Sequence, residues 1–432
     1  MCDYISELLA EKGFINGIYV PWFHKDWFGH DIGKSVYDDY KNCFFNENYI
    51  RRVLHNCKVI DFDMVKIWLN ESFEGILFDE NGSVIGVEPT FKKNFIKLLS
   101  IVTEYGLKIS LCINAHQETD YSDNKFLYDK YMRYIYSPIE TEKYILNWLN
   151  PILNIVSDYN CVAMIDIYAE PEADGGGWEV SRGFSWNTMI RFINRVHRAI
   201  KEKDPRLATT VSSGASTTFL SKGKYNTVEV DYLGADIYTD DGCFENTKDI
   251  MLDRPFMLGE YGLSNYSTAT DDDQVSVVDS YLKNCLKYGV AAAFYWCYGW
   301  KCDSAGEMHL VNSEGDMRKA AAYFHFVQLD RKNTTEDSFK IDKPALLSVE
   351  TPLKISWFKT RGADRYVVQR KVAGGFKNIC EIDDSKKDDY LEIMKCCDNE
   401  GNDSSIYRVV SIMPDGSTVI SNEVAVLKGC EI

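Results

Sequence analysis

The sequence lacks a long apolar run, an excess of basic residues and any cluster of cysteine or histidine at metal-ligand spacing. Its apolar runs, such as Val290–Phe294, are far shorter than the roughly 20 residues that a helix needs to cross a bilayer, so we expect no membrane-spanning helix. The chain has 48 Lys and Arg against 65 Asp and Glu, a formal net charge of −17. Because nucleic acids and anionic membranes are polyanions, this charge argues against both as partners.

The 13 cysteines are an odd number and lack repeated C-x-x-C pairs, although Cys396 and Cys397 are adjacent. We therefore expect most of them to be small buried hydrophobic residues in a reducing compartment. The first four residues show neither the basic start nor the apolar stretch of a secretory signal. The default expectation is a cytoplasmic protein, and secretion stays open if a signal was removed.

The composition is that of a folded protein, with 45% hydrophobic and 13% aromatic residues and no excess of its 10 Pro or 28 Gly. A chain of 432 residues is longer than one core normally supports, so we expect one large and one smaller domain. The 27 Tyr, 22 Phe and 9 Trp either fill a large core or partly line a sugar-binding cleft.

Short apolar runs alternate with helical stretches over the first 330 residues. Several runs are apolar almost throughout, which is typical of parallel strands covered on both faces. Helices are predicted at Pro89–Tyr105 and Asp272–Tyr288, each followed by a glycine suited to end it. Eight such units predict an α/β fold of the (β/α)8 barrel type, although the fifth and sixth helices are weak. The expected strands are Phe14–Val20, Phe62–Leu69, Leu107–Asn114, Cys161–Tyr168, Leu207–Ser213, Asp231–Tyr238, Pro255–Glu260 and Val290–Cys297.

The pattern changes after residue 330. A polar stretch over 331–343 predicts a linker, and the runs beyond it alternate between apolar and polar residues, with Gly, Asp and Asn between them. We therefore expect a barrel domain over 1–330, which is the catalytic domain, a linker over 331–343 and a small all-β domain over 344–432. The expected strands of that domain are Leu353–Trp357, Arg365–Val372, Ile406–Ile412 and Val419–Val426.

Reactive side chains of such a barrel gather at the C-terminal ends of its strands. Two carboxylates stand there, Glu170 after the fourth strand and Glu260 at the end of the seventh. Glycoside hydrolysis uses one protonated and one ionised carboxyl, with flat aromatic faces that hold the sugar rings. The side chains at the other strand ends that we expect to contact the substrate are Trp22, His24, Trp68, Asn114, His116, Tyr238 and Trp296.

Two motifs at these strand ends resemble those of the clan A glycoside hydrolases. Ile165–Glu172 (IDIYAEPE) resembles their strand-four acid/base motif, and Met257–Gly262 (MLGEYG) resembles their strand-seven nucleophile motif. The segment Met64–Ile113 is similar to family 5-like members of the cellulase and mannanase type. The resemblance implies that Glu170 is the acid/base and Glu260 the nucleophile of a retaining enzyme. It also implies a β-linked oligosaccharide or polysaccharide as substrate, with no cofactor and no metal.

Three positions depart from the pattern of that clan. Ala169 stands where the clan usually has Asn, Lys66 where it has Arg, and Asp236 where it has His. By the resemblance, Tyr238 donates a hydrogen bond to Glu260 and Lys66 supports it, although Lys cannot form the bidentate fork of Arg. Asp236 would add a negative charge beside the same carboxylate.

The C-terminal part, from about Pro344, resembles a fibronectin type III domain. Ile355–Trp357 is similar to its second strand with the core Trp, Gly362–Val368 to its third strand, and Ile406–Val410 to its sixth strand with the Tyr. The resemblance implies an immunoglobulin-like or fibronectin-like sandwich attached behind the barrel.

Alternatives stay open at this point. Glu172 is the main rival to Glu170, with the capping of the next helix as its structural role. A non-catalytic carbohydrate-binding barrel is the second hypothesis, raised by Ala169. A metal-dependent hydrolase is weaker, because the 7 histidines include no H-x-H at a strand end. The sugar, its linkage, endo or exo action and the oligomeric state stay undetermined.

Overall fold

The structure is a computed structural model, in which eight parallel strands form a closed barrel in the order β1-β10-β9-β8-β7-β6-β5-β2. The barrel closes where Ile15 and Ile18 of β1 pair with Ala292 and Tyr295 of β10. The (β/α)8 barrel predicted from the sequence is therefore confirmed. The structure describes residues 3–23, 31–70, 73–115, 129–174, 185–214, 217–238, 244–245, 254–263, 269–299, 309–312, 314–329, 337–339, 343–387 and 389–428.

All eight expected barrel strands are present within one or two residues of their expected ends. Their bounds are β1 (Ile15–Tyr19), β2 (Met64–Trp68), β5 (Lys108–Cys112), β6 (Val162–Ala169), β7 (Ala208–Ser213), β8 (Tyr232–Ile237), β9 (Phe256–Tyr261) and β10 (Ala292–Tyr295). A hairpin of β3 (Ile76–Phe78) and β4 (Val84–Val87) follows β2 and lies outside the barrel sheet.

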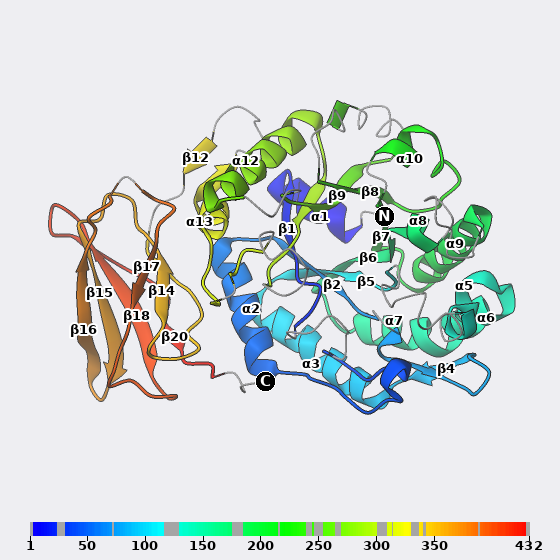
Figure 1. Ribbon diagram of the computed structural model, residues 1–432, viewed down its shortest axis with the longest axis horizontal. Coiled ribbons are helices and arrows are strands. Elements are labelled where there is room, and N and C mark those ends of the chain that lie inside the picture. Colours follow the sequence, from blue (N-terminus) through cyan, green and yellow to red (C-terminus); the bar gives the residue numbers. More distant parts are fainter. Residues whose placement is uncertain are drawn as a thin grey trace.

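Helices surround the barrel (Figure 1). Both predicted helices are present: α3 has the predicted ends, and α12 begins one residue earlier than predicted. Pro89 opens α3 while the Glu88 side chain accepts hydrogen bonds from the first turn, and Gly106 ends it in the left-handed conformation. The helices are α1 (Tyr4–Lys12), η1 (Val36–Asp38), α2 (Glu47–Ile60), α3 (Pro89–Tyr105), α5 (Arg133–Tyr136), α6 (Pro138–Tyr144), η3 (Ile145–Leu149), α7 (Asn150–Val156), α8 (Pro171–Asp174), α9 (Trp186–Lys203), α10 (Thr218–Ser221), α12 (Asp271–Tyr288) and α13 (Lys319–Phe326).

The N-terminal end of the barrel is closed by an apolar cluster. Ile5 and Leu8 of α1 pack there against inward side chains of the strands, including Met64, Met164 and Met257. Because the interior is filled with side chains at this end, the strands have a packed floor below their C-terminal ends. Among the described residues, none of the helices is both long and apolar enough to cross a bilayer.

The C-terminal residues form a β-sandwich, as expected. One sheet has the order β13-β14-β17, and the other has the order β16-β15-β18-β19 with β20 paired to β18. A fibronectin type III domain stays a prediction, as do the domain boundaries. Residues 331–336 and 340–342 of the expected linker lie outside the described residues. The strands are β13 (Ala345–Leu346), β14 (Ile355–Phe358), β15 (Arg365–Val372), β16 (Gly375–Asp383), β17 (Ile393–Cys396), β18 (Ile406–Ile412), β19 (Thr418–Ile420) and β20 (Val424–Ala425), preceded by a pair of β11 (Val327–Leu329) and β12 (Asp337–Phe339).

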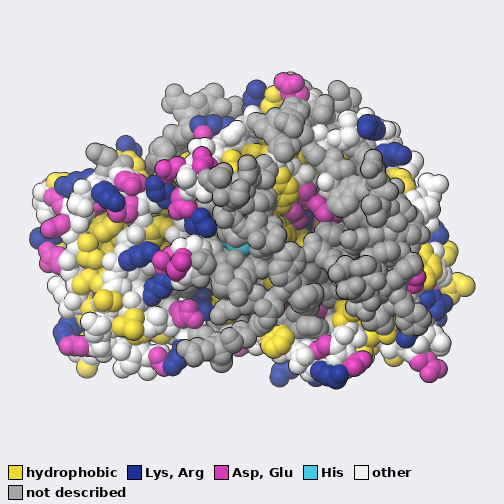
Figure 2. Space-filling view, viewed as in Figure 1, with side chains coloured by type: hydrophobic (Ala, Val, Ile, Leu, Met, Phe, Trp, Pro, Cys, Tyr) yellow, Lys and Arg dark blue, Asp and Glu magenta, His cyan; other side chains and the backbone are white. Residues whose placement is uncertain are grey.

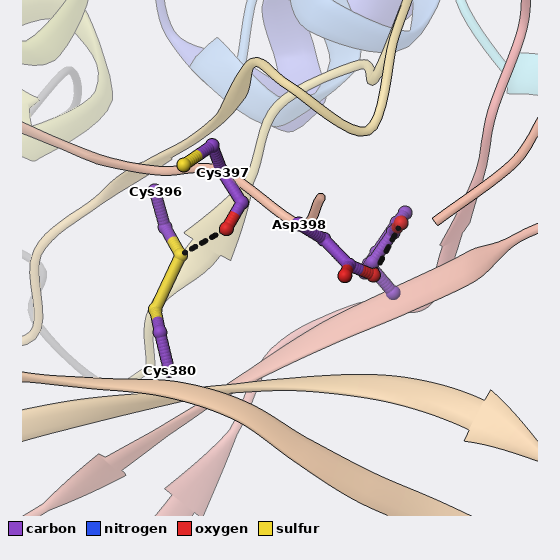
Figure 3. The surroundings of a disulfide bond; sticks show 5 residues. Cys380, Cys396, Cys397 and Asp398 are labelled. Atoms are coloured by element: carbon purple, nitrogen blue, oxygen red, sulfur yellow. Dashed lines mark hydrogen bonds between the residues drawn. A yellow bond between two sulfur atoms is a disulfide. The ribbon is translucent and has the colours of Figure 1, made fainter. Parts of the chain in front are cut away.

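One expectation about the cysteines needs correction. Cys380 of β16 and Cys396 of β17 form a disulfide that links the two sheets (Figure 3). The sequence pattern missed it because the two residues are 16 positions apart and come together only when the sheets face each other. Other cysteines are buried free thiols, as expected; these are Cys57, Cys112, Cys161 and Cys285.

The sandwich lies beside the barrel, against α2 and α13 (Figure 1). The backbone of Ser348 donates a hydrogen bond of 2.7 Å to Asn56 of α2, and Arg52 of the same helix forms an ion pair of 2.5 Å with Glu350. His325 of α13 stacks on Phe358 with 4.7 Å between the ring centroids. These contacts lie on the outside of the barrel, away from its interior.

Candidate active site

Three carboxyl groups meet at the C-terminal end of the barrel. They belong to Glu170, directly after β6, to Asp236 on β8, and to Glu260 on β9. One oxygen of each lies within 4.8 Å of one oxygen of each of the others. Figure 2 shows acidic side chains next to hydrophobic ones near the centre of the view. Carboxyls this close can share protons, and they are also close enough to coordinate one cation.

The backbone around Glu170 is shaped to present its side chain. Glu170 has a left-handed backbone with φ of 53°, a conformation that costs energy for a residue with a Cβ. Its amide donates a hydrogen bond of 2.8 Å to the carbonyl of Ser212 at the end of β7. A Cβ added at Gly214 would lie 2.6 Å from the Glu170 carboxyl carbon. Glycine at 214 therefore leaves the room that the carboxyl occupies.

The carboxylate of Glu260 has a strong neutral donor. The phenol of Tyr238 donates a hydrogen bond of 2.6 Å to Glu260 Oε2. Burial and the neighbouring charge of Glu260 raise the pKa of Tyr238 well above its usual value, so the phenol keeps its proton and remains a donor. Hydrogen bonds of this kind stabilise the ionised form of the acceptor.

The nearest partner of Lys66 is a buried carboxylate, and the support of Glu260 by Lys66 stays a prediction. Its ammonium lies 2.7 Å from the carboxylate of Asp166 on β6, and both side chains are almost completely buried. Burial alone would lower the pKa of Lys66, but the charge of Asp166, aided by nearby acidic groups, holds it above the usual value. Lys66 therefore neutralises Asp166 in the barrel interior, and the charge of Glu260 acts on it more weakly than that of Asp166.

An aromatic wall stands beside the carboxyl groups. Trp22, Trp68 and Trp296 pack edge to face or tilted against one another, with ring centroids 4.8 to 6.1 Å apart. Tyr19 packs against two of these indoles, and Ala169 belongs to the same cluster. The structure thus brings all three expected tryptophans together, although each is at most 7% exposed. Their mutual packing limits how much of each ring face a sugar could contact.

The side-chain amide of Asn114 is hydrogen-bonded within the protein at both its oxygen and its nitrogen. Its Oδ1 accepts a hydrogen bond of 3.1 Å from the Tyr134 hydroxyl, and its Nδ2 donates one of 3.0 Å to the Ile167 carbonyl. An additional, longer bond comes from Asn70. Asn114 therefore has little hydrogen-bonding capacity left for a substrate and positions the strand ends instead. The other two residues expected at the site, His24 and His116, lie outside the described residues.

Glu172, the rival acid, is fully buried beneath the site. It accepts hydrogen bonds from Ser213, from the backbone of Gly214 and from the Tyr225 hydroxyl. Burial raises its pKa, and these donors partly oppose that effect. A buried carboxyl with this set of partners anchors α8 to the end of β7 and to Tyr225, rather than facing a cleft.

Sequence reasoning missed two residues that shape the site, Asp166 and Gly214. A signal for Asp166 was present: it is the one charged residue in the buried strand β6, and Lys66 is the one charged residue in β2. A buried charge needs a partner of opposite sign, so two such strands in one barrel indicate a pair. Gly214 carried no such signal, because its importance depends on where the Glu170 side chain points.

Structure comparison places this fold among known ones. A β-1,4-D-mannanase from Cryptopygus antarcticus matches with a TM-score of 0.55 at 15% identity, over 76% of this chain and 94% of the other. The β-mannanase of the blue mussel Mytilus edulis matches with a TM-score of 0.51 at 18% identity, over 70% and 93%. An exo-β-1,4-mannosidase from Opitutaceae bacterium strain TAV5 matches with a TM-score of 0.53 at 16% identity, over 72% and 58%.

No protein-family model and no curated protein sequence matches the chain. At 15 to 18% identity, the structural matches establish a shared fold. The fold and the site together define a (β/α)8 barrel with a cluster of acidic side chains at the C-terminal ends of its strands. In architecture, the barrel is of the kind found in the β-mannanases.

Proposed function

We propose that this protein is a retaining glycoside hydrolase that acts on β-linked oligosaccharides or polysaccharides. The observation that carries the proposal is the approach of the Glu170 and Glu260 carboxyls, whose nearest oxygens are no more than 4.8 Å apart. Retaining enzymes hold their two carboxyls about 5 to 5.5 Å apart, whereas inverting enzymes need about 6.5 to 9.5 Å to admit a water molecule.

In this proposal, Glu260 attacks the anomeric carbon and Glu170 donates a proton to the leaving oxygen. A glycosyl–enzyme ester forms on Glu260 as the glycosidic bond breaks. Glu170 then takes a proton from water, which attacks the same carbon and releases Glu260. Tyr238 supports the assignment of Glu260 as the ionised partner, because its hydrogen bond stabilises a negative charge there.

The proposed substrate class is supported by the carboxyl geometry and by the position of Trp22, Trp68 and Trp296 beside it, where the small exposed part of each ring can contact a sugar. Indole and phenol rings offer the flat apolar surface that sugar rings pack on. The structural neighbours are named as β-1,4-mannanases and an exo-β-1,4-mannosidase, so β-1,4-mannan oligosaccharides belong on the first panel of substrates. Aryl β-glycosides complete that panel, since an activated leaving group needs little acid catalysis.

The decisive test replaces Glu260. Glu260→Gln removes the nucleophile and should lower kcat by roughly 10⁴-fold or more, on the scale seen when other enzymes lose theirs. Glu260→Ala with added azide should form a glycosyl azide of inverted configuration, while Glu170→Ala with azide should form one of retained configuration. Product NMR distinguishes these results, and full activity of Glu260→Gln on an aryl glycoside would refute the proposal.

Glu172→Gln is the matched control. Glu172 is two residues from Glu170 and lies in α8, directly after it, but it is buried against Ser213 and Tyr225. Its replacement should leave most of the activity in place, provided that circular dichroism shows a folded protein. A loss equal to that of Glu170→Gln would transfer the acid role to Glu172.

A non-catalytic carbohydrate-binding barrel is the second candidate. The observation that favours it is Ala169, which cannot hydrogen-bond a sugar hydroxyl, while the amide of Asn114 is already taken by Tyr134 and Ile167. Saturable binding of an oligosaccharide by calorimetry, with no hydrolysis anywhere on the panel, would establish this candidate.

A further inference from the structure

Asp236 is the third carboxyl of the cluster, and the proposed mechanism gives it no role. It lies on β8, two residues before Tyr238, and is 3% exposed. Both of its carboxyl oxygens are buried, and neither has a hydrogen-bond partner in the part of the chain that the structure describes. An ionised carboxylate in such a position would lack the donors that replace its lost hydration.

The groups that face Asp236 come from every neighbouring element. Glu260 of β9 and Glu170 after β6 each bring a carboxyl oxygen within 4.8 Å. Lys66 of β2 is the cation among the main charges that act on it, and that ammonium lies 2.7 Å from Asp166 of β6. The positive charge next to the cluster is therefore already balanced by a carboxylate outside it.

The backbone of β9 fixes Asp236 against the barrel wall. A Cβ added at Gly259 would lie 2.5 Å from Asp236 Oδ1, so glycine at 259 lets the carboxyl pack directly on the main chain. The carbonyl of the same glycine lies 3.4 Å from the Lys66 ammonium. Asp236 thus sits between the Lys66–Asp166 pair below and the two glutamates above.

We propose that Asp236 carries a proton in the working enzyme and is a positioning residue that limits the three-carboxyl cluster to one negative charge. This inference rests on the proposed function. With Asp236 neutral, Glu260 is the group that ionises and Glu170 keeps the proton that it transfers. Were Asp236 ionised, a second negative charge within 4.8 Å would drive Glu260 to take up a proton, and the nucleophile would be lost.

The direction of the electrostatic effects agrees with this assignment. Burial raises the pKa of Asp236 well above its usual value, and the charges of Glu260 and Glu170 raise it further, against the opposing effect of Lys66. Buried carboxylic acids that stay protonated at neutral pH are known catalytic-site groups.

The first test detects the protonation state of Asp236 directly, by NMR of the unmutated protein. Aspartate labelled with ¹³C at the side-chain carboxyl is incorporated, and carboxyl NMR signals are followed from about pH 5 to pH 9, the range in which an ordinary aspartate is ionised. We expect one aspartate to remain protonated after the other aspartates have ionised, and its signal to be absent from Asp236→Asn. Asp31 also has a pKa raised by burial, to about 7, so Asp31→Asn identifies its signal.

A spectrum in which every aspartate has ionised by the pH at which Asp31 ionises would overturn the inference, as would a protonated signal that persists in Asp236→Asn. Loss of the protonated signal on addition of Ca²⁺ or Mg²⁺ would also overturn it, by showing that the three carboxyls hold a cation instead. The signal is read without turnover, so this test fails or succeeds independently of the Glu260→Gln experiment.

The second test uses the acid limb of the pH profile of kcat/KM, which reports the ionisation of the nucleophile. If Asp236 is neutral, Asp236→Asn exchanges one neutral group for another, and the acid limb should move by less than about 0.3 pH unit. If Asp236 is ionised, removing its charge should move that limb down by about one pH unit or more. Asp236→Ala, which deletes the group, should lower kcat/KM more than Asp236→Asn does, because the amide still fills the site.

Discussion

The two ends of the barrel interior are built from the same strands but have opposite chemistry. Met64 of β2 lies in the apolar cluster at the N-terminal end, and Lys66, two residues further, forms a buried ion pair. The same step along β6 leads from Met164 to Asp166. Since inward positions recur every second residue, one step of about 6.6 Å separates an apolar layer from a charged one.

This difference separates stability from function along each strand. The N-terminal layer buries apolar side chains together with Ile5 and Leu8 of α1, which stabilises the fold. The layers above it contain buried polar atoms that have no hydrogen-bond partner among the described residues. These include Tyr19 Oη, Ser110 Oγ, Asp166 Oδ1, Thr210 Oγ1 and both oxygens of Asp236. Such groups lower the free energy of unfolding, and the apolar cluster at the N-terminal end of the barrel compensates for that loss.

The largest effect on stability is expected from breaking the charged layer. Lys66→Met leaves Asp166 buried without its cation and should lower the free energy of unfolding by about 3 to 5 kcal/mol. Urea denaturation followed by tryptophan fluorescence measures the change. A variant as stable as the original protein would contradict a role of the Lys66–Asp166 pair in the stability of the barrel interior.

The double variant Lys66→Met with Asp166→Leu provides the control. Replacing both charges by apolar groups removes the uncompensated carboxylate, so most of the lost stability should return. The activity should not return in parallel, because the double variant also removes the positive charge of Lys66, which acts on Asp236 and Glu260. Recovery of neither quantity would indicate that the side chains of this layer act through packing alone.

A smaller loss of stability is expected at the apolar end. Met257→Ala, on the same strand as Glu260, opens a cavity in the floor and should cost about 2 to 4 kcal/mol. Met257→Leu keeps the volume and should cost less than about 1.5 kcal/mol. At a temperature where the variants remain folded, kcat/KM should stay within about twofold of the original value. A tenfold loss of activity without a matching loss of stability would contradict the separation of the two ends.

Much of the fold could be predicted from the sequence, because the barrel strands are covered on both faces and are therefore apolar throughout. The boundaries of α3 followed from Pro89 and Gly106, whose backbone preferences act locally. The strand β16 was missed because most of its side chains are half or fully exposed, so it shows no clean alternation. The β3–β4 hairpin was missed because its strands have only three and four residues.

The site could be predicted only in part. Glu170 and Glu260 were identified from motifs at strand ends, and the structure brings them together with Tyr238. The partner of Lys66 could not be read from the local sequence, since Asp166 is 100 residues away and meets it only across the closed barrel. Asn114 was expected to face the substrate, but Tyr134, from the segment after β5, occupies its oxygen. Which polar atoms remain available is decided by such long-range contacts.

The smallest effect is expected at the polar end itself, from removing one hydrogen bond and no charge. Tyr238→Phe deletes the 2.6 Å bond to Glu260 and should lower kcat/KM by about tenfold, since a bond to a charged group contributes about 1.5 kcal/mol or more. The donor stabilises the ionised form, so without it Glu260 takes up a proton more readily. Because the nucleophile must be ionised, the acid limb of the pH profile should move up by about one pH unit.

The direction of that shift distinguishes this variant from Asp236→Asn, for which the acid limb should hardly move. Asp236 lies on β8 and Tyr238 directly after it, and both are close to Glu260. They form a matched pair, because Tyr238 donates a hydrogen bond to the nucleophile whereas Asp236 only limits the negative charge around it. An acid limb that moves down in Tyr238→Phe would mean that Glu260 is protonated in the working enzyme. In that outcome, the roles of Glu170 and Glu260 would have to be exchanged.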